Sequence, residues 1–173
     1  MDIQLFSKDS LKIKSKKATL AIDPKTPIQK FDADAVVLMD KNCDVTRVTN
    51  FRVVIDSVGE YEVSGLKISG KGSDGDTFFA LNSDSVSALI AKASSLEKAQ
   101  AEKIGEYKIL IINADTELNQ GRITAMEPSV VILYGEKTKE GAKSLGKENA
   151  QTAAKITISD DKLPEEMEVT ILA

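Results

Sequence analysis

The sequence contains no histidine in its 173 residues, and this absence removes much familiar catalytic chemistry. Histidine is the commonest metal-binding side chain, and it is the only side chain whose ordinary pKa lies between about 5 and 8. Without it the chain cannot form a serine–histidine–aspartate triad, a cysteine–histidine pair or a histidine-rich zinc site. The commonest kinds of hydrolase site are therefore excluded.

Cysteine and long apolar runs are also scarce. Cys43 is the only cysteine, so an intramolecular disulfide is impossible, which fits a reducing compartment. No stretch approaches the roughly 20 apolar residues of a membrane-spanning helix. The opening MDIQLFSKDS has an acidic second residue and no long apolar run, unlike a signal peptide. We therefore expect a cytoplasmic protein without membrane association.

Length and composition indicate one ordinary globular domain over residues 1–173. Hydrophobic residues make up 42% of the chain and charged residues 29%, and the formal net charge is −4. This balance argues against a dedicated nucleic-acid binder. Lys12, Lys14 and Lys16 alternate with residues of the opposite strand face, which is typical of a solvated face. Nucleic-acid binding through these lysines is the weakest functional hypothesis.

Short alternating or apolar runs predict many strands in the first half of the chain. They cover residues 3–6, 11–14, 19–22, 35–39, 52–55, 61–63, 66–69, 77–81 and 86–90. Asp23-Pro24 breaks the chain after the third run, and Ser64-Gly65 is the expected turn of one hairpin. Residues 82–85 are the expected turn of another.

The second half alternates expected helices and strands. Ser94 or Ser95 can cap a helix that runs to about Ile104, with Glu97 placed for a capping box. Residues 116–126 predict a short helix or loop, and residues 137–145 a helix. Buried strands are expected at 108–112 and 130–133, and closing strands at 155–159 and 168–172. This order predicts a layered α/β or α+β sandwich.

Three stretches of the chain resemble the small metallo-β-lactamase-fold hydrolases. The opening MDIQLFSKDSLKIKSKKATLAIDP resembles the first hairpin of the family and its Asp23-Pro24 turn, with Lys8 in place of a histidine. Residues 53–70, VVIDSVGEYEVSGLKISG, resemble a segment of a compact prokaryotic branch. The ending KITISDDKLPEEMEVTILA is similar to the closing strands of that branch. The resemblance implies a single four-layer αβ/βα sandwich.

The resemblance also implies a metal site, typically of zinc, whose main motif is His-x-His-x-Asp-His. The corresponding residues here begin at Asp40, which replaces the first histidine, and Asn42 replaces the second. Asp44 matches the aspartate that the family keeps, while Val45 replaces the last histidine of the motif. One of the ligands in this motif is therefore retained, which is too few for zinc.

The later ligand positions of the family fall on residues without a side-chain donor. By the resemblance they correspond to Ile90, a position near Ala93, and about Gly135. Zinc needs three or four nitrogen, sulfur or oxygen donors at about 2.0–2.3 Å. We therefore expect no zinc, no hydrolysis by zinc-bound hydroxide, and no other cofactor.

An oxygen-only metal site is the open alternative. Asp40, Asn42 and Asp44 have the spacing of the first ligands of a calcium loop. An EF-hand would need glycine and glutamate where Val45 and Phe51 stand, so that motif is rejected. A weak magnesium, calcium or manganese site remains, and with it a hydrolase that uses it. The default interpretation is a polar loop after a strand.

Two further candidates favour structural interpretations. Carboxylates beside Cys43 would raise its pKa, so an unreactive thiol is expected rather than a nucleophile. Glu60 and Glu62 share a strand face and would allow acid–base work. We favour a structural motif in which Gly59 permits a tight turn and Tyr61 anchors the segment on the core.

Residues 70–76 are rich in glycine but lack the P-loop pattern, and predict a solvated hairpin connection. These observations together predict a non-catalytic member of the fold, a pseudoenzyme with a binding, assembly or regulatory role. Its partner would be a second copy, giving a homo-oligomer, or an active paralogue. The sequence does not choose between them.

Overall fold

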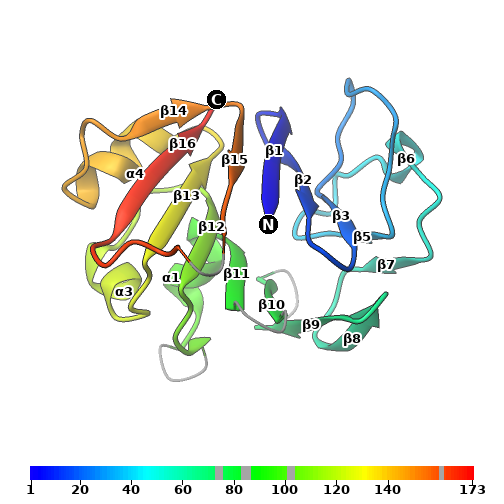
Figure 1. Cartoon of the computed structure of the whole chain (residues 1–173), viewed down its shortest axis with the longest axis horizontal. Coiled ribbons are helices and arrows are strands. Elements are labelled where there is room, and N and C mark those ends of the chain that lie inside the picture. The colour runs from blue at the N-terminus through cyan, green and yellow to red at the C-terminus, as the bar shows by residue number, and fades with distance from the viewer. Residues whose placement is uncertain (73–75, 83–86, 101–103, 160–161) are drawn as a thin grey trace.

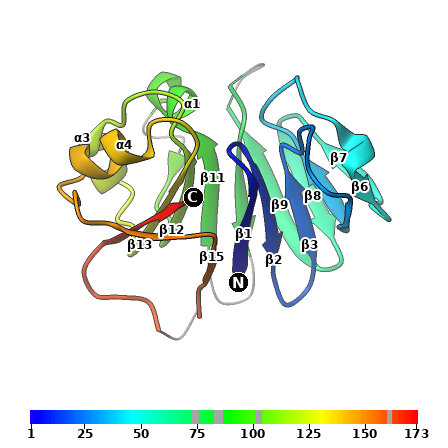
Figure 2. The same cartoon turned by 90° about the horizontal axis from the view of Figure 1, so that it is seen from above.

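The computed structural model describes residues 1–72, 76–82, 87–100, 104–159 and 162–173. Two large β-sheets pack face to face (Figure 1), and helices cover the outer side of one of them (Figure 2). Apolar side chains from both sheets fill the space between them, among them Ile3, Leu20, Phe79 and Ile111. The layered sandwich expected from the sequence is confirmed.

The first sheet has six strands in the order β15-β1-β2-β3-β5-β7. These strands are β15 (Lys155–Thr157), β1 (Asp2–Ser7), β2 (Ser10–Lys14), β3 (Thr19–Ile22), β5 (Ala35–Val37) and β7 (Val53–Ile55). Neighbours from β15 to β3 run antiparallel, whereas β3, β5 and β7 run parallel. In β2, Leu11 and Ile13 face the core. The alternating Lys12 and Lys14 are more exposed, as the sequence pattern predicts.

The second sheet has eight strands in the order β14-β16-β13-β12-β11-β10-β9-β8. They are β14 (Gln151–Ala153), β16 (Glu168–Leu172), β13 (Val130–Tyr134), β12 (Ile109–Asn113), β11 (Ser87–Lys92), β10 (Phe78–Asn82), β9 (Leu66–Lys71) and β8 (Gly59–Val63). Strands β11, β12, β13 and β16 run parallel. All residues of β12 and β13 are buried, because the core covers one face and helices cover the other.

The helix layer consists of α1 (Ala93–Lys98), α3 (Gln120–Thr124) and α4 (Thr138–Ser144). Leu96, Ile123 and Ala142 of these helices join a second apolar cluster with Leu110 and Leu133 of the sheet. The helix expected at 137–145 is confirmed as the shorter α4, and α3 occupies part of residues 116–126, where the sequence left a short helix or a loop open.

The expected capping of the first helix is wrong. Helix α1 begins at Ala93 and follows Lys92, which makes no side-chain capping bond. Ser94 lies inside the helix and donates its hydroxyl hydrogen to the carboxylate of Asp115. The helix ends at Lys98 rather than near Ile104, and residues 101–103 of the expected helix lie outside the described part of the chain.

The outer side of the six-stranded sheet carries a thin fourth layer. It contains the short strands β4 (Phe31–Asp32) and β6 (Val48–Thr49) and the 3₁₀ turn η1 (Val45–Arg47). Their apolar residues pack on Ala21 and Val36 of the sheet. The four layers of the expected sandwich are thus formed. In the layer outside the six-stranded sheet, the described residues form short strands, a 3₁₀ turn and irregular chain instead of an α-helix.

Several local features differ from the sequence prediction. Strand β14 was not predicted, and the two closing strands β15 and β16 lie in different sheets. Of the expected hairpin turn at 82–85, residues 83–85 lie outside the described part, as do residues 73–75 of the glycine-rich segment. No helix among the described residues is long and apolar enough to cross a membrane.

Candidate functional site

Strand ends from both sheets meet at one edge of the sandwich. A cleft of about 540 Å³ opens there, and it is lined by Leu38, Met39, Asp40, Lys41, Asp56, Thr77 and Lys92. Asp40 and Asp56 follow β5 and β7 of the first sheet, whereas Lys92 ends β11 of the second. Crevices at the carboxyl ends of parallel strands are where open α/β sheets bind ligands. This cleft is therefore the candidate site.

Asp23 organises the floor of the site from the end of β3. Its backbone has φ of 42°, and its side chain is buried. Oδ1 accepts the backbone N–H groups of Met39 at 2.7 Å and Asp40 at 3.0 Å. Ser10 donates its hydroxyl hydrogen to the Asp23 carbonyl at 2.7 Å. The Asp23-Pro24 turn thus fixes the loop after β5.

Two buried polar atoms near this floor have no hydrogen-bond partner among the described residues. They are Asp23 Oδ2 and the Tyr134 hydroxyl oxygen. Burial raises the pKa of Asp23 to about 6, although the N–H groups of Met39 and Asp40 favour its charged form. Burial also raises the pKa of Tyr134 well above its usual value, and the negative charge of Asp23 adds to this. Asp23 therefore carries a buried charge that is only half satisfied by hydrogen bonds.

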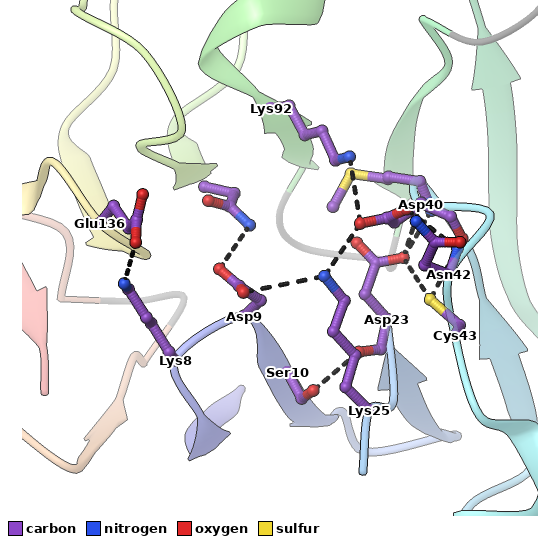
Figure 3. Close-up of polar contacts among 12 residues, drawn as sticks. Lys8, Asp9, Ser10, Asp23, Lys25, Asp40, Asn42, Cys43, Lys92 and Glu136 are labelled. Carbon is purple, nitrogen blue, oxygen red and sulfur yellow. Dashed lines mark hydrogen bonds and ion pairs between the residues drawn. The ribbon is translucent and has the colours of Figure 1, made fainter.

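Asp40 faces two lysines (Figure 3). Its Oδ2 lies 2.9 Å from Lys25 Nζ and 3.7 Å from Lys92 Nζ. Its Oδ1 accepts the backbone N–H of Asn42 at 3.0 Å. The N–H of Asn42 and the ammonium of Lys25 lower the pKa of Asp40 to about 2. Asp40 is therefore an ionised carboxylate whose two oxygens are both engaged.

Asp44 serves a different part of the structure. Its side chain caps η1 by accepting the backbone N–H of Thr46, and it also accepts the Thr26 hydroxyl at 2.5 Å. Arg47 donates its Nε–H to Asp44 at 3.1 Å. The hydroxyls of Thr26 and Thr46 hold the pKa of Asp44 well below its usual value. This carboxylate is therefore occupied by its own loop.

The three candidate metal ligands make different contacts. Asp40 faces lysines, Asp44 caps a turn, and Asn42 contributes its backbone N–H to this network. Among the described residues, no group of three or more aspartate, glutamate or cysteine side chains has an arrangement that could hold a metal ion. A divalent cation needs several converging oxygen donors. The donor set therefore does not fit the metal centre that the fold implies.

Cys43 is held within the same loop. Its thiol donates to the carbonyl oxygen of Asp40 at 3.1 Å and lies 3.5 Å from Asp23 Oδ1. Burial and the negative charge of Asp23 raise the pKa of Cys43 to about 12. Since the thiolate is the nucleophile, this cysteine is poorly suited to catalysis.

The remaining ligand positions implied by the resemblance carry no donors. Ile90 is buried in the core, and Ala93 begins α1. Gly135 has φ of 101°, and a Cβ there would lie 2.3 Å from Asn113 Oδ1. A side chain at this position would collide with the chain around it. Strand β11 continues past Ile90, so Lys92 is the residue that reaches the cleft.

Several contacts at this edge were not predicted, and two of them join the two sheets (Figure 3). Lys25 Nζ lies 3.7 Å from Asp9 Oδ2, and Asn113 Nδ2 lies 3.5 Å from Asp9 Oδ1. Lys8, which by the resemblance corresponds to a histidine, forms an ion pair with Glu136. Asn113 and Asp9 are 104 residues apart in the chain, so no local pattern could indicate their contact.

The Gly-Glu-Tyr-Glu segment lies outside the lining of the cleft, on the edge strand β8. The Tyr61 hydroxyl donates to the Ser57 carbonyl at 3.2 Å, and its ring packs against the core. Glu60 accepts the hydroxyl of Ser69 at 2.6 Å, and Glu62 is exposed. Gly59 is part of the strand rather than a tight turn, although its φ of 148° favours glycine.

Comparisons with known proteins identify the fold. No family model matches the chain, and no curated protein matches it. A candidate Zn-dependent hydrolase of the metallo-β-lactamase superfamily from Thermotoga maritima superposes with a TM-score of 0.78 at 22% identity, covering 99% of this chain and 98% of that one. The likeness extends over essentially the whole of both chains.

Two more distant structures agree. The metallo-β-lactamase fold protein YhfI from Bacillus subtilis gives a TM-score of 0.57 at 9% identity, covering 98% of this chain and 95% of that one. The diiron β-hydroxylase CmlA from Streptomyces venezuelae gives 0.58 at 11% identity, with 99% of this chain but 52% of that one covered. The chain therefore has the metallo-β-lactamase fold, which is shared by proteins of different activity.

Proposed function

We propose that this chain is a non-catalytic metallo-β-lactamase-fold protein, a pseudoenzyme that uses the scaffold for binding, assembly or regulation. One observation carries the proposal. Asp40 in the cleft is paired with Lys25 and Lys92, Asp44 caps η1, and the described acidic and cysteine side chains form no group that could hold a metal ion. Fold alone does not give activity, which depends on the chemistry of the site.

A catalytic metal centre needs free donors and an open coordination position. Asp40 and Asp44 are engaged by cationic side chains and hydroxyls, and Cys43 has a raised pKa. The alternative, a hydrolase with an oxygen-ligated metal at Asp40, Asn42 and Asp44, would require this network to be rebuilt. No contact of the described residues favours that alternative.

The proposed role requires a partner, which is a second copy of the chain or an active paralogue. The single cysteine is compatible with work in the reducing cytoplasm. The requirement for a partner is tested by light scattering of the purified protein, alone and after co-expression with a paralogue. A stable oligomer or complex supports it. A monomer that also forms no complex with the paralogue contradicts it.

Thermal unfolding tests the non-catalytic part. We expect the same melting temperature in EDTA and in Zn²⁺, Mg²⁺, Mn²⁺ or Ca²⁺, because a ligand stabilises a protein only by binding its folded state. An increase caused by one ion and removed by Asp40→Asn would instead support the metal-dependent hydrolase.

A further inference from the structure

We infer that the ammonium groups of Lys25 and Lys92 act as built-in cations that take the place of a metal ion at the strand-end cleft. The inference deepens the proposed function at the same site, because it states what neutralises the carboxylates there. It rests on the arrangement of the two lysines around Asp40, Asp9 and Asp23.

The two lysines approach Asp40 from different elements (Figure 3). Lys25 follows β3, and its Nζ lies 2.9 Å from Asp40 Oδ2 and 3.7 Å from Asp9 Oδ2. Lys92 ends β11 of the opposite sheet, and its Nζ lies 3.7 Å from the same Asp40 oxygen. One carboxylate oxygen thus receives a cation from each sheet, and Lys25 also links two loops of the first sheet.

These groups are less exposed than the Lys8–Glu136 ion pair at the same edge of the sandwich. The four side chains of the cluster are between 21% and 33% exposed, whereas the Lys8–Glu136 pair is 55% and 67% exposed. Surface pairs contribute little because water and salt screen them, and partly buried charges are screened less. The cluster is therefore built into the fold rather than resting on its surface.

A second observation concerns the negative charge that the two lysines neutralise. Asp23 is buried beside Asp40 and Lys25 (Figure 3), and its Oδ2 has no hydrogen-bond partner among the described residues. Three carboxylates, those of Asp9, Asp23 and Asp40, would then lack a counter-charge. As they stand, these carboxylates do not form a group that could hold a metal ion. Two ammonium groups carry the same charge as one divalent ion, so removing them should leave a charge deficit that a hard cation relieves once the carboxylates turn toward it.

The test replaces the ammonium groups without adding new donors. The double variant Lys25→Met/Lys92→Met removes both charges and keeps the length of the side chains. Lys41→Met is the matched control, because Lys41 lines the same cleft and is exposed. The double variant Lys25→Arg/Lys92→Arg retains the charge. Isothermal titration with Mn²⁺ and thermal unfolding are measured on each protein.

We expect the double methionine variant to bind Mn²⁺ with a Kd of about 10⁻⁴–10⁻³ M, as weak oxygen sites do. Without metal it should melt about 2–8 °C below the Lys41→Met control. The wild type, the arginine variant and Lys41→Met should not bind. Adding Asp40→Asn to the double variant should abolish Mn²⁺ binding.

A folded double variant that does not bind Mn²⁺ would overturn the inference, whatever its melting temperature. If that variant is unfolded in buffer, circular dichroism measures whether it refolds in MnCl₂ and in NaCl at the same ionic strength. Refolding by Mn²⁺ alone supports the inference, and no refolding contradicts it. A metal-free wild type together with a non-binding double variant refutes this inference but leaves the proposed function intact. Stoichiometric metal in the wild type refutes the proposed function.

Discussion

The carboxylate of Asp23 accepts the backbone N–H of Met39 at 2.7 Å across the start of the loop that follows β5. The same oxygen accepts the N–H of Asp40, so one buried side chain sets the direction in which Asp40 enters the cleft. The position of Asp40, and with it the lysine cluster, therefore depends on a residue that is not itself in the cleft lining.

Replacing Asp23 by alanine should destabilise the protein by about 2–4 kcal/mol, because two buried N–H groups lose a charged acceptor. Asp23→Asn should cost less, since its amide oxygen can accept one of these bonds and asparagine tolerates positive φ. Urea unfolding of the three proteins measures the difference. Equal stability of wild type and Asp23→Ala would show that this contact does not hold the loop.

The raised pKa of Asp23 predicts a pH dependence. The pKa is about 6 in the folded state and 3.8 in a free side chain, so between those values the folded state keeps a proton that the unfolded state has released. Stability should therefore fall as pH rises through this window, by an amount on the order of 2–3 kcal/mol. The contribution is absent in Asp23→Asn.

Unfolding free energies of wild type and Asp23→Asn between about pH 4 and 7 provide the measurement. The lowered pKa of Asp40, about 2, acts in the opposite direction and at lower pH, where protonation removes its stabilising contacts. Its effect is common to both proteins. Parallel stability curves for the two proteins would contradict the raised pKa of Asp23.

The thiol of Cys43 should be nearly unreactive in the folded protein. Its pKa of about 12 lowers the thiolate fraction about 1,000-fold relative to a thiol with a pKa of 9.0. Alkylation by iodoacetamide at about pH 8 should then be roughly 30- to 60-fold slower in buffer than in urea, allowing for the greater nucleophilicity of a basic thiolate. Similar rates would show that Cys43 is not held as described.

Asp44→Ala should lower the melting temperature by a few degrees, because Asp44 caps η1 and accepts the Arg47 Nε–H. Asn42→Ala is the matched control in the same loop, since Asn42 contributes its backbone N–H, and should change little. Neither substitution should alter the response to divalent ions. A metal response that either variant abolishes would favour the oxygen-ligated alternative.

Gly135→Ala should cost about 2–4 kcal/mol, because the added Cβ would lie 2.3 Å from Asn113 Oδ1 at a φ of 101°. Gly146→Ala is the control, because its φ is also positive but nothing lies within 4 Å of the added Cβ. It should cost about 1 kcal/mol. Equal costs would show that residue 135 can accept a Cβ without displacing Asn113.

Local patterns predicted the strands of this fold well, because alternation and apolar runs report burial directly. The run at 108–112 became β12, and the Asp23-Pro24 turn lies where expected. Helix α1 was predicted less well. The hydroxyl of Ser94 binds Asp115 instead of capping the helix, and no local pattern shows that competing partner.

The cluster at the cleft was invisible in the sequence for a similar reason. Lys25 and Lys92 contact Asp40 through the packing of two sheets, and lysines are common in solvated positions. By its resemblance to the metallo-β-lactamase-fold hydrolases, the sequence predicted residues without side-chain donors, Ile90 and Gly135, at positions of metal ligands. It did not indicate which cations would face the surviving carboxylates, because this depends on the register and length of β11.

Metal content tests the central claim most directly. The wild-type protein is expressed in medium supplemented with Zn²⁺ and Mn²⁺, purified without chelator and measured by elemental analysis. The account predicts far less than one metal ion per chain in the wild type. One bound ion per chain, lost when Asp40 is replaced by asparagine, would contradict it and identify a metal-dependent site.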